Sequence, residues 1–346
     1  MPFRFPRARR HALTLSAVVT AALALGACSS TAEQPAAKPA ATAAGAFPVT
    51  IDSALGQAKI TQQPKRVVTL GQGSAETAIA LGTVPVGIES YEWGSDKTGY
   101  LPWIHEAVTK TGGPLPKQFK GGEDIDMDAI VELEPDVILA PWSGITKEQY
   151  AVLSGIAPTV AYPDLPWSTN WDQQIEIVAK ALGKPGEAPE LIAGVKKNLG
   201  DAAATRPQYQ GKTFSYIYTS GPGTLGVFKP EEQRVAMVSM LGLTVDPVVG
   251  EFKETEGTDS ALIGLENAQK LAESDLVFTF YTDEKTRKEI EAQKLYAAIP
   301  AVKRGGVVAG DDTSFVTASS IINPLTVPWV IDRYLPLIDK AVATVK

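Results

Sequence analysis

The stretch PKRVVTLGQGSAETAIALGTVPVGI, residues 64–88, sets out the fold in three short segments. The β-branched run at 66–70 predicts a strand, and the segment at 74–82 predicts a helix that ends at Gly82. The apolar run at 84–88 predicts a second strand. A strand, a helix and a strand at this spacing indicate a unit of a mostly parallel α/β sheet.

The same alternation continues to about residue 162. DMDAIVEL and TKEQYAVLSGI predict helices, and DVILA and PTVAY predict strands, at 126–133, 146–156, 136–140 and 158–162 respectively. The region 83–125 is rich in Gly, Pro, Trp and Tyr, and we expect most of it to be a long loop. Residues 47–170 are therefore expected to form an N-terminal α/β lobe.

The second half repeats this pattern. KTFSYIYTS predicts a strand and EEQRVAMVSMLG a helix, and LENAQKLAESDLVFTF parallels MDAIVELEPDVILA closely. A helix and a strand follow at 286–299 and 305–311, so residues 207–346 are expected to form a second α/β lobe. Apolar residues at helical spacing predict a helical linker over 171–206. The fold class is α/β, with two Rossmann-like lobes of mostly parallel sheet, one long helical linker and a ligand cleft between the lobes.

The first residues have the composition of an export signal. MPFRFPRARRH carries four Arg and no acid, and the following sixteen residues are uncharged, too few to span a bilayer comfortably. Leu25 to Cys28 resembles the lipobox of bacterial lipoproteins, which implies a signal peptide at 1–27 and a lipid on Cys28. Residues 28–46, poor in large apolar side chains, are expected to be a flexible tether. We expect an extracytoplasmic protein on the outer face of the cell membrane; the alternative is a secreted protein with a chance Cys.

Composition excludes several classes of function. Residues 1–27 hold four of the 32 basic side chains and none of the 39 acidic ones, so the remainder carries 28 basic against 39 acidic groups, a net charge of −11. Such a chain is a poor nucleic-acid binder. With His105 as the one histidine after residue 27 and Cys28 lipidated, a zinc or copper site is hard to assemble, and we expect no cofactor and no metal bound directly by the chain.

Two motifs suggest enzymes and are better explained otherwise. GPGTLG at 221–226 spells G-x-G-x-x-G, but Pro222 removes a phosphate-binding N–H and the next helix is expected only near Pro230. GQGSAE places a serine after a strand but lacks the G-x-S-x-G pattern of a nucleophile elbow. We therefore expect a protein that binds a ligand and is not an enzyme.

Several of these segments together resemble a known family. The stretch at 64–88, DIDMDAIVELEPDVIL, LSGIAPTV, IVAKALGK and VFKPEEQRVAMVSMLGL are similar to the iron-siderophore and vitamin B12 substrate-binding proteins of ABC importers, from about residue 60 to 335. The resemblance is strongest to the ferric-siderophore branch. It implies two lobes that clasp the ligand, an ABC permease as partner and a monomeric receptor. It also implies that Asp128 and Glu266, at matching places in the two lobes, dock on arginines of the permease.

Aromatic side chains are abundant in the loops expected to line the cleft. They suit a large chelate because they give rigid contact area at low entropic cost. We expect Trp93 and Trp142 to contact the ligand foremost, with further contacts from Tyr91, Trp103, Tyr218 and Phe228. Since many ferric siderophores are anionic, we expect the guanidinium of Arg234 to hydrogen bond to ligand oxygens.

The sequence leaves three functions open. Capture of a ferric siderophore is the leading hypothesis. A receptor for haem or cobalamin is an alternative within the family, because ten Tyr leave an axial haem ligand possible. A cell-surface interaction lipoprotein is the alternative from another class.

Overall fold

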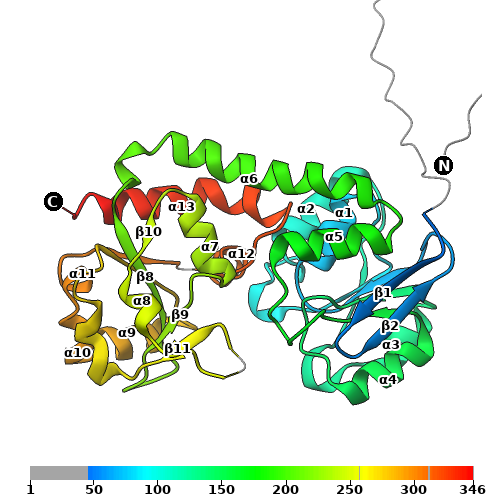
Figure 1. Ribbon diagram of the computed structural model, residues 1–346, viewed down its shortest axis with the longest axis horizontal. Helices are drawn as coiled ribbons and strands as arrows, with labels where there is room; N and C mark the ends of the chain where they lie inside the picture. Colours follow the sequence, from blue (N-terminus) through cyan, green and yellow to red (C-terminus); the bar gives the residue numbers. More distant parts are fainter. Residues whose placement is uncertain (1–45, 257, 311, 346) are drawn as a thin grey trace, which may run out of the picture. The chain divides into compact units, whose positions relative to one another are not determined.

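The computed structural model describes residues 46–256, 258–310 and 312–345; the signal peptide, most of the tether and Cys28 lie outside them. Residues 43–346 form one compact unit. Within it, the strands before residue 171 build one sheet and a hairpin, and the strands after residue 206 build a second sheet (Figure 1). We call these two parts the N-lobe and the C-lobe.

The N-lobe sheet has five parallel strands in the order β5-β4-β3-β6-β7. An antiparallel hairpin, β1–β2, precedes it. The strands are β1 (Val49–Ser53), β2 (Gly56–Ile60), β3 (Val67–Thr69), β4 (Gly87–Glu89), β5 (Lys117–Phe119), β6 (Val137–Leu139) and β7 (Thr159–Val160). The helices are α1 (Ser74–Ala80), η1 (Glu92–Gly94), α2 (Pro102–Thr111), η2 (Gly122–Asp124), α3 (Met127–Glu132) and α4 (Lys147–Ile156).

Two helices join the lobes. α5 (Trp171–Ala181) packs against α1 of the N-lobe, and α6 (Ala188–Ala204) packs against α5, α7 and α13. A short turn, η3 (Pro185–Glu187), lies between them, and η4 (Pro207–Tyr209) leads into the C-lobe.

The C-lobe sheet has six strands and mixed direction. β10, β8, β12 and β13 are parallel, while β9 and β11 pair antiparallel at one edge. The strands are β8 (Thr213–Tyr218), β9 (Gly226–Phe228), β10 (Thr244–Val245), β11 (Ser260–Leu262), β12 (Leu276–Thr279) and β13 (Val307–Ala309). The helices are α7 (Gln233–Met240), α8 (Val248–Glu251), η5 (Leu265–Leu271), α9 (Glu284–Glu291), α10 (Lys294–Ala297), α11 (Pro300–Lys303), α12 (Thr313–Ala318) and α13 (Thr326–Val342).

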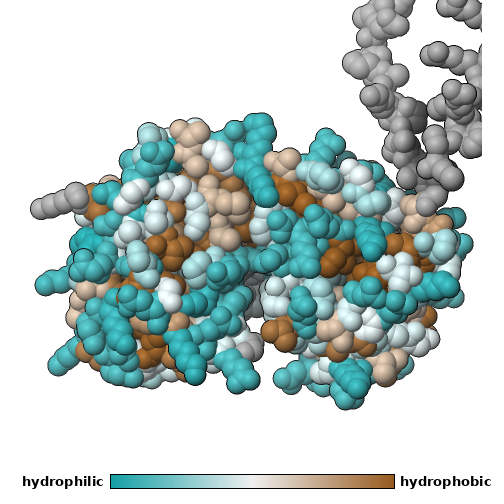
Figure 2. Space-filling model, viewed as in Figure 1, coloured by the Kyte–Doolittle hydropathy of each residue, from teal (hydrophilic) through white to brown (hydrophobic). Residues whose placement is uncertain are grey.

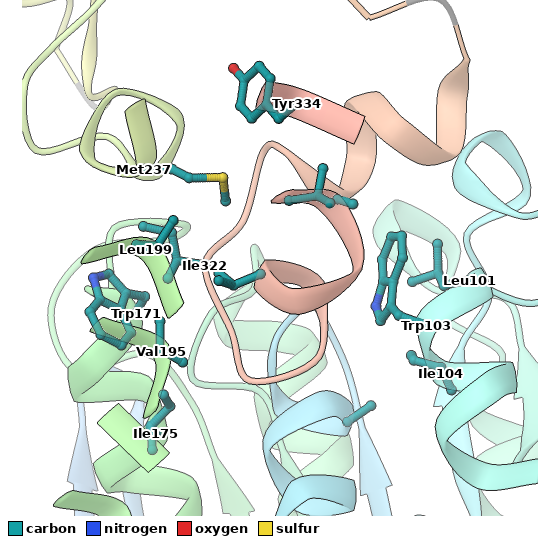
Figure 3. Close-up of a cluster of buried hydrophobic side chains, with 14 of the residues drawn as sticks. Leu101, Trp103, Ile104, Trp171, Ile175, Val195, Leu199, Met237, Ile322 and Tyr334 are labelled. Carbon is teal, nitrogen blue, oxygen red and sulfur yellow. The ribbon is translucent and has the colours of Figure 1, made fainter. Parts of the chain in front are cut away.

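Burial of both faces of each sheet explains the continuous apolar strands. In β3, Val67 contacts one hydrophobic cluster and Val68 another; in β12, Leu276 and Val277 divide in the same way. Strands covered on both faces need apolar side chains at every position rather than at alternate ones. One of the clusters contains residues from α2, α5, α6, α7 and α13 and therefore runs through both lobes (Figure 3).

The prediction of a long loop over 83–125 is wrong, because this region contains helix α2 and strand β5. α2 begins at Pro102, which suits the first turn because proline lacks an N–H that would go unpaired there. It ends at Gly112, whose left-handed φ of 71° closes the helix. Ile104 and Val108 lie on its buried face, and β5 follows as an edge strand.

Candidate functional site

The carboxyl ends of the N-lobe strands border a cavity of about 560 Å³. Ligands of open α/β sheets bind at this edge, where loops rather than strands supply the side chains. The walls are apolar, hydroxylic and acidic: Leu70, Glu89, Gly122, Glu123, Ile125, Ser143, Gly144, Ile145, Thr146, Gln149 and Trp167.

Two tryptophans stand together beside this cavity. The rings of Trp142 and Trp167 meet edge to face with centroids 4.8 Å apart, and Trp167 is 44% exposed. A Cβ atom at Gly144 would lie 2.5 Å from Nε1 of Trp167, so only glycine leaves room for that indole. The predicted residue Trp142 is half-buried and does not itself line the cavity, but it contacts Trp167, which does.

Glu89, the last residue of β4, brings a carboxylate to the cavity. Its Oε2 accepts a hydrogen bond from the backbone N–H of Gly71, which follows β3, at 2.8 Å. Burial raises the pKa of Glu89, and backbone hydrogen bonds from Gly71 and Gly122 oppose that rise. The carboxylate is therefore held where the loops after β3, β4 and β5 meet.

The loop after β4 contains two predicted residues. Trp93 lies in η1 and is 44% exposed, while Tyr91 before it is half-buried. Burial raises the pKa of Tyr91 well above its ordinary value, and the charges of Glu89 and Glu76 add to the effect. The next residue, Gly94, accepts a hydrogen bond from Ser314 Oγ of α12 at 2.9 Å, so Trp93 adjoins a contact between the lobes.

Trp103 is not a cleft residue in this structure. It is 3% exposed and lies within the hydrophobic cluster (Figure 3). Its Nε1–H donates to Glu76 Oε1 at 2.9 Å, and its ring lies edge-on to Trp329 with centroids 5.4 Å apart. Trp103 lies on the buried face of α2, a helix that the sequence prediction lacked. Its role here is packing between α2 and α13.

In the C-lobe, Arg234 lies over an aromatic surface. Its guanidinium carbon is 4.6 Å from the ring centroid of Phe228 and 5.6 Å from that of Phe280. Nε donates to Ser320 Oγ at 3.1 Å, and the side chain is 23% exposed. A guanidinium held in this way loses little conformational entropy when it binds a ligand oxygen.

The carboxylate of Glu232 forms an ion pair with the guanidinium of Arg234. This carboxylate accepts hydrogen bonds from the backbone N–H and from Nη1 of Arg234, the latter at 2.5 Å, and it caps the N-terminus of α7. Burial raises the pKa of Glu232 to about 7 although the nearby Arg234 lowers it. The predicted cation is thus half of a largely buried ion pair.

The other two predicted C-lobe residues are brought to the same surface. The rings of Tyr218 and Phe228 lie 4.8 Å apart, and both side chains are half-buried. The Tyr218 hydroxyl is 3.1 Å from Ser260 Oγ on β11, and its ring covers Gly226. Gly226, the last residue of the GPGTLG stretch, begins strand β9, so this stretch forms the turn between the antiparallel strands β8 and β9 and does not lead into a helix.

Asp128 and Glu266 occupy equivalent positions. Each is exposed and lies in the first helical turn of its element, α3 or η5. Neither takes part in an ion pair with a described residue.

The described residues contain neither a cluster of metal ligands nor a helix able to span a membrane. Residues 46–256, 258–310 and 312–345 contain no group of three His, Cys, Asp or Glu side chains placed to hold a metal ion. In the same part of the chain, every helix is too short or too polar to traverse a bilayer.

Comparison with known proteins identifies the family. The model of the periplasmic binding protein family matches residues 67–313. The chain belongs to the periplasmic binding protein family. This confirms the resemblance and the two-lobed α/β fold class inferred from the sequence, and places the chain among substrate-binding proteins of transport systems.

Relatives in this family cover most of the chain. The probable siderophore-binding lipoprotein YfiY of Bacillus subtilis is 27% identical over 304 residues, which is 79% of this chain and 83% of YfiY. The ferric enterobactin-binding periplasmic protein FepB of Escherichia coli is 26% identical and covers 78% of this chain and 86% of its own. The structure of PiaA from Streptococcus pneumoniae in complex with ferrichrome aligns with a TM-score of 0.78 and 32% identity, over 86% of this chain and 99% of PiaA.

None of the seven ligand residues predicted from the sequence lines the N-lobe cavity, and the lining includes Trp167 and Glu89, which the prediction lacked. Trp167 is one of many loop aromatics, and its pairing with Trp142 depends on tertiary contact. Glu89 had a signal that could have found it: it immediately follows the apolar strand VPVGI, at the edge where ligands of parallel sheets bind.

Proposed function

We propose that this protein captures a ferric siderophore outside the membrane and delivers it to the permease of an ABC importer. The observation that carries the proposal is the pair of aromatic surfaces at the loop edges of the two lobes, Trp142 with Trp167 and Phe228 beneath Arg234. Sites with rigid aromatic walls and few placed polar groups are typical of small-molecule receptors. The printed functions of YfiY, FepB and PiaA support the same ligand class.

Binding needs no covalent step. The ligand would lie between the N-lobe cavity and the Arg234 surface, where aromatic rings cover its apolar parts. The guanidinium of Arg234 would donate to oxygen atoms of the iron chelate, since its planar fork matches paired oxygens. This role is binding and release, and we propose no enzymatic activity.

We also propose that the protein is a monomer held to the membrane by a lipid on Cys28. The apolar stretch before Cys28 and the polar stretch after it support this arrangement. The word lipoprotein in the name of YfiY supports it too.

The test is a fluorescence titration of the full chain with Cys28 replaced by serine, using ferric siderophores, haemin and cobalamin. We expect saturable quenching of tryptophan emission by a ferric siderophore at sub-micromolar concentration, about tenfold weaker in Arg234→Lys. Arg287→Lys is the matched control, because Arg287 is likewise paired with a glutamate and placed over a tyrosine ring. Saturation by haemin or cobalamin alone would replace the proposal with that ligand, and silence across the panel would reject it.

A further inference from the structure

The charge of the N-lobe cavity constrains which siderophore it can accept. Its lining includes two carboxylates, Glu89 and Glu123, and no Lys, Arg or His side chain among the described residues. The remaining walls are apolar or carry hydroxyl and amide groups. An anionic group in this cavity would give up water and gain no cation in exchange, which is unfavourable.

Glu89 is placed to accept hydrogen bonds from a ligand. The backbone N–H of Gly71 donates to Oε2 and the backbone of Gly122 also hydrogen bonds to the carboxylate, which leaves about two of its four acceptor positions for a ligand. No described cation forms an ion pair with it. Gly121 lies so close that a Cβ there would be 2.2 Å from Oε1 of Glu89, so the carboxylate is confined to one position.

Lys147, the basic residue that directly follows Thr146 of the lining, is exposed and does not itself line the cavity. Three other basic side chains have partners. Lys120, on the loop after β5, is 3.1 Å from Asp124. Lys229 donates to the carbonyl oxygens of Val249 and Phe252. Arg234 carries its counter-charge, Glu232, with it. The described site therefore offers an anion little uncompensated positive charge.

We propose that Glu89 makes this cavity selective for neutral or cationic ferric hydroxamates over anionic ferric catecholates and carboxylates. The inference rests on the proposed function and names its ligand class. An N–H or ammonium group of the siderophore would donate to the free positions of the Glu89 carboxylate. The same carboxylate would repel a chelate with net negative charge.

A series of ferric chelates that differ in charge tests this selectivity in the unsubstituted site. Dissociation constants are measured by calorimetry for neutral ferrichrome, cationic ferrioxamine B, and the anions ferric enterobactin and ferric dicitrate. We expect one of the two hydroxamates to bind at least tenfold more tightly than either anion. Tighter binding of an anion would overturn the inference and leave the proposed function standing, whereas no binding by any member would overturn both.

The variant Glu89→Gln tests the residue, with Glu132→Gln, exposed on α3, as the control. The Glu89→Gln substitution replaces a charged hydrogen-bond acceptor by a neutral group of the same shape. It should weaken binding of the cationic chelate about tenfold and tighten binding of the anionic chelates. Equal ratios of cation to anion affinity in Glu89→Gln, Glu132→Gln and the parent chain would overturn the role of Glu89. Thermal unfolding verifies that each variant is folded, and if Glu89→Gln is not, the charge series alone decides the inference.

Discussion

Two tryptophans ten residues apart show how one residue type serves two purposes. Trp93 is exposed beside the contact between the lobes, whereas Trp103 is enclosed between α2 and α13. Both lie in a region rich in Gly, Pro and aromatic residues, and both were predicted from the sequence to lie in the same loop. The packing of α2 distinguishes the exposed indole of Trp93 from the core indole of Trp103.

We expect Trp93→Ala to lower siderophore affinity and leave the free energy of unfolding within about 0.5 kcal/mol of the parent. Trp103→Ala should destabilise the fold by about 3–5 kcal/mol, because it opens a cavity and removes the indole N–H that donates to Oε1 of the buried Glu76. Urea denaturation of both variants measures the difference. A stable Trp103→Ala protein with weakened binding would return Trp103 to the ligand site.

At the scale of elements, the central strands of both sheets and most helices were predictable, whereas α2 and the edge strand β5 were not. The segments at 66–70, 136–140 and 212–220 have few charged residues because their sheets are buried on both faces. The sequence therefore predicts these strands. α2 is flanked by prolines and glycines that resemble loop residues, although Pro102 and Gly112 in fact begin and end it. The hairpin β1–β2 joins neighbouring segments that were not predicted from the sequence, and β9 pairs antiparallel with β11, which is distant in sequence.

The candidate site was predictable only in part, for the same reason. The sequence shows that Trp142 closely follows a predicted strand and that Arg234 follows a strand and its loop. Both positions could therefore be predicted to lie near the sheet edge where ligands bind. The Glu89 carboxylate is fixed by Gly71 from another strand, and the Trp142–Trp167 pair forms across 25 residues of chain. Such contacts depend on the tertiary structure, and no local sequence pattern predicts them.

Glu232, the N-terminal cap of α7, is predicted to make the stability of the fold depend on pH. Burial raises the pKa of Glu232 in the folded state to about 7 from its ordinary value of 4.5, so the folded state binds more protons between these values. Its contribution to stability is full below about pH 4.5 and is lost as the pH rises through 7. Glu232→Gln should therefore gain stability relative to the parent over this range, by up to about 3 kcal/mol.

Unfolding free energies of the two proteins at pH 5 and pH 8 measure this change. Glu231→Gln, an exposed neighbour, serves as the control and should shift little with pH. A difference between parent and Glu232→Gln that is the same at both pH values would contradict the raised pKa.

At the scale of the whole molecule, the lobes are connected by more than the chain. A common hydrophobic cluster passes through α5, α6, α7 and α13 (Figure 3). The Ser314–Gly94 hydrogen bond and the Trp103–Trp329 contact also join α12 and α13 to the N-lobe. The surface is hollowed where the two lobes meet (Figure 2). A shared apolar core limits relative motion more than a polar interface does.

The exposed acids of the two lobes predict separate effects on binding and transport. Asp128→Lys combined with Glu266→Lys should leave siderophore affinity unchanged and reduce uptake into cells about tenfold or more, because both docking charges are reversed. Glu132→Lys with Glu273→Lys is the matched control, with the same change in net charge on the same two lobes. Equal uptake by the two double variants would argue against docking through Asp128 and Glu266.

Capture of an iron chelate is the central claim, and equilibrium dialysis against radioactive ferric hydroxamate tests it most directly. The full chain with Cys28→Ser should retain one ferric chelate per molecule at micromolar concentration, and Arg234→Ala should retain markedly less. Retention of no ferric siderophore by the folded parent protein would contradict the account.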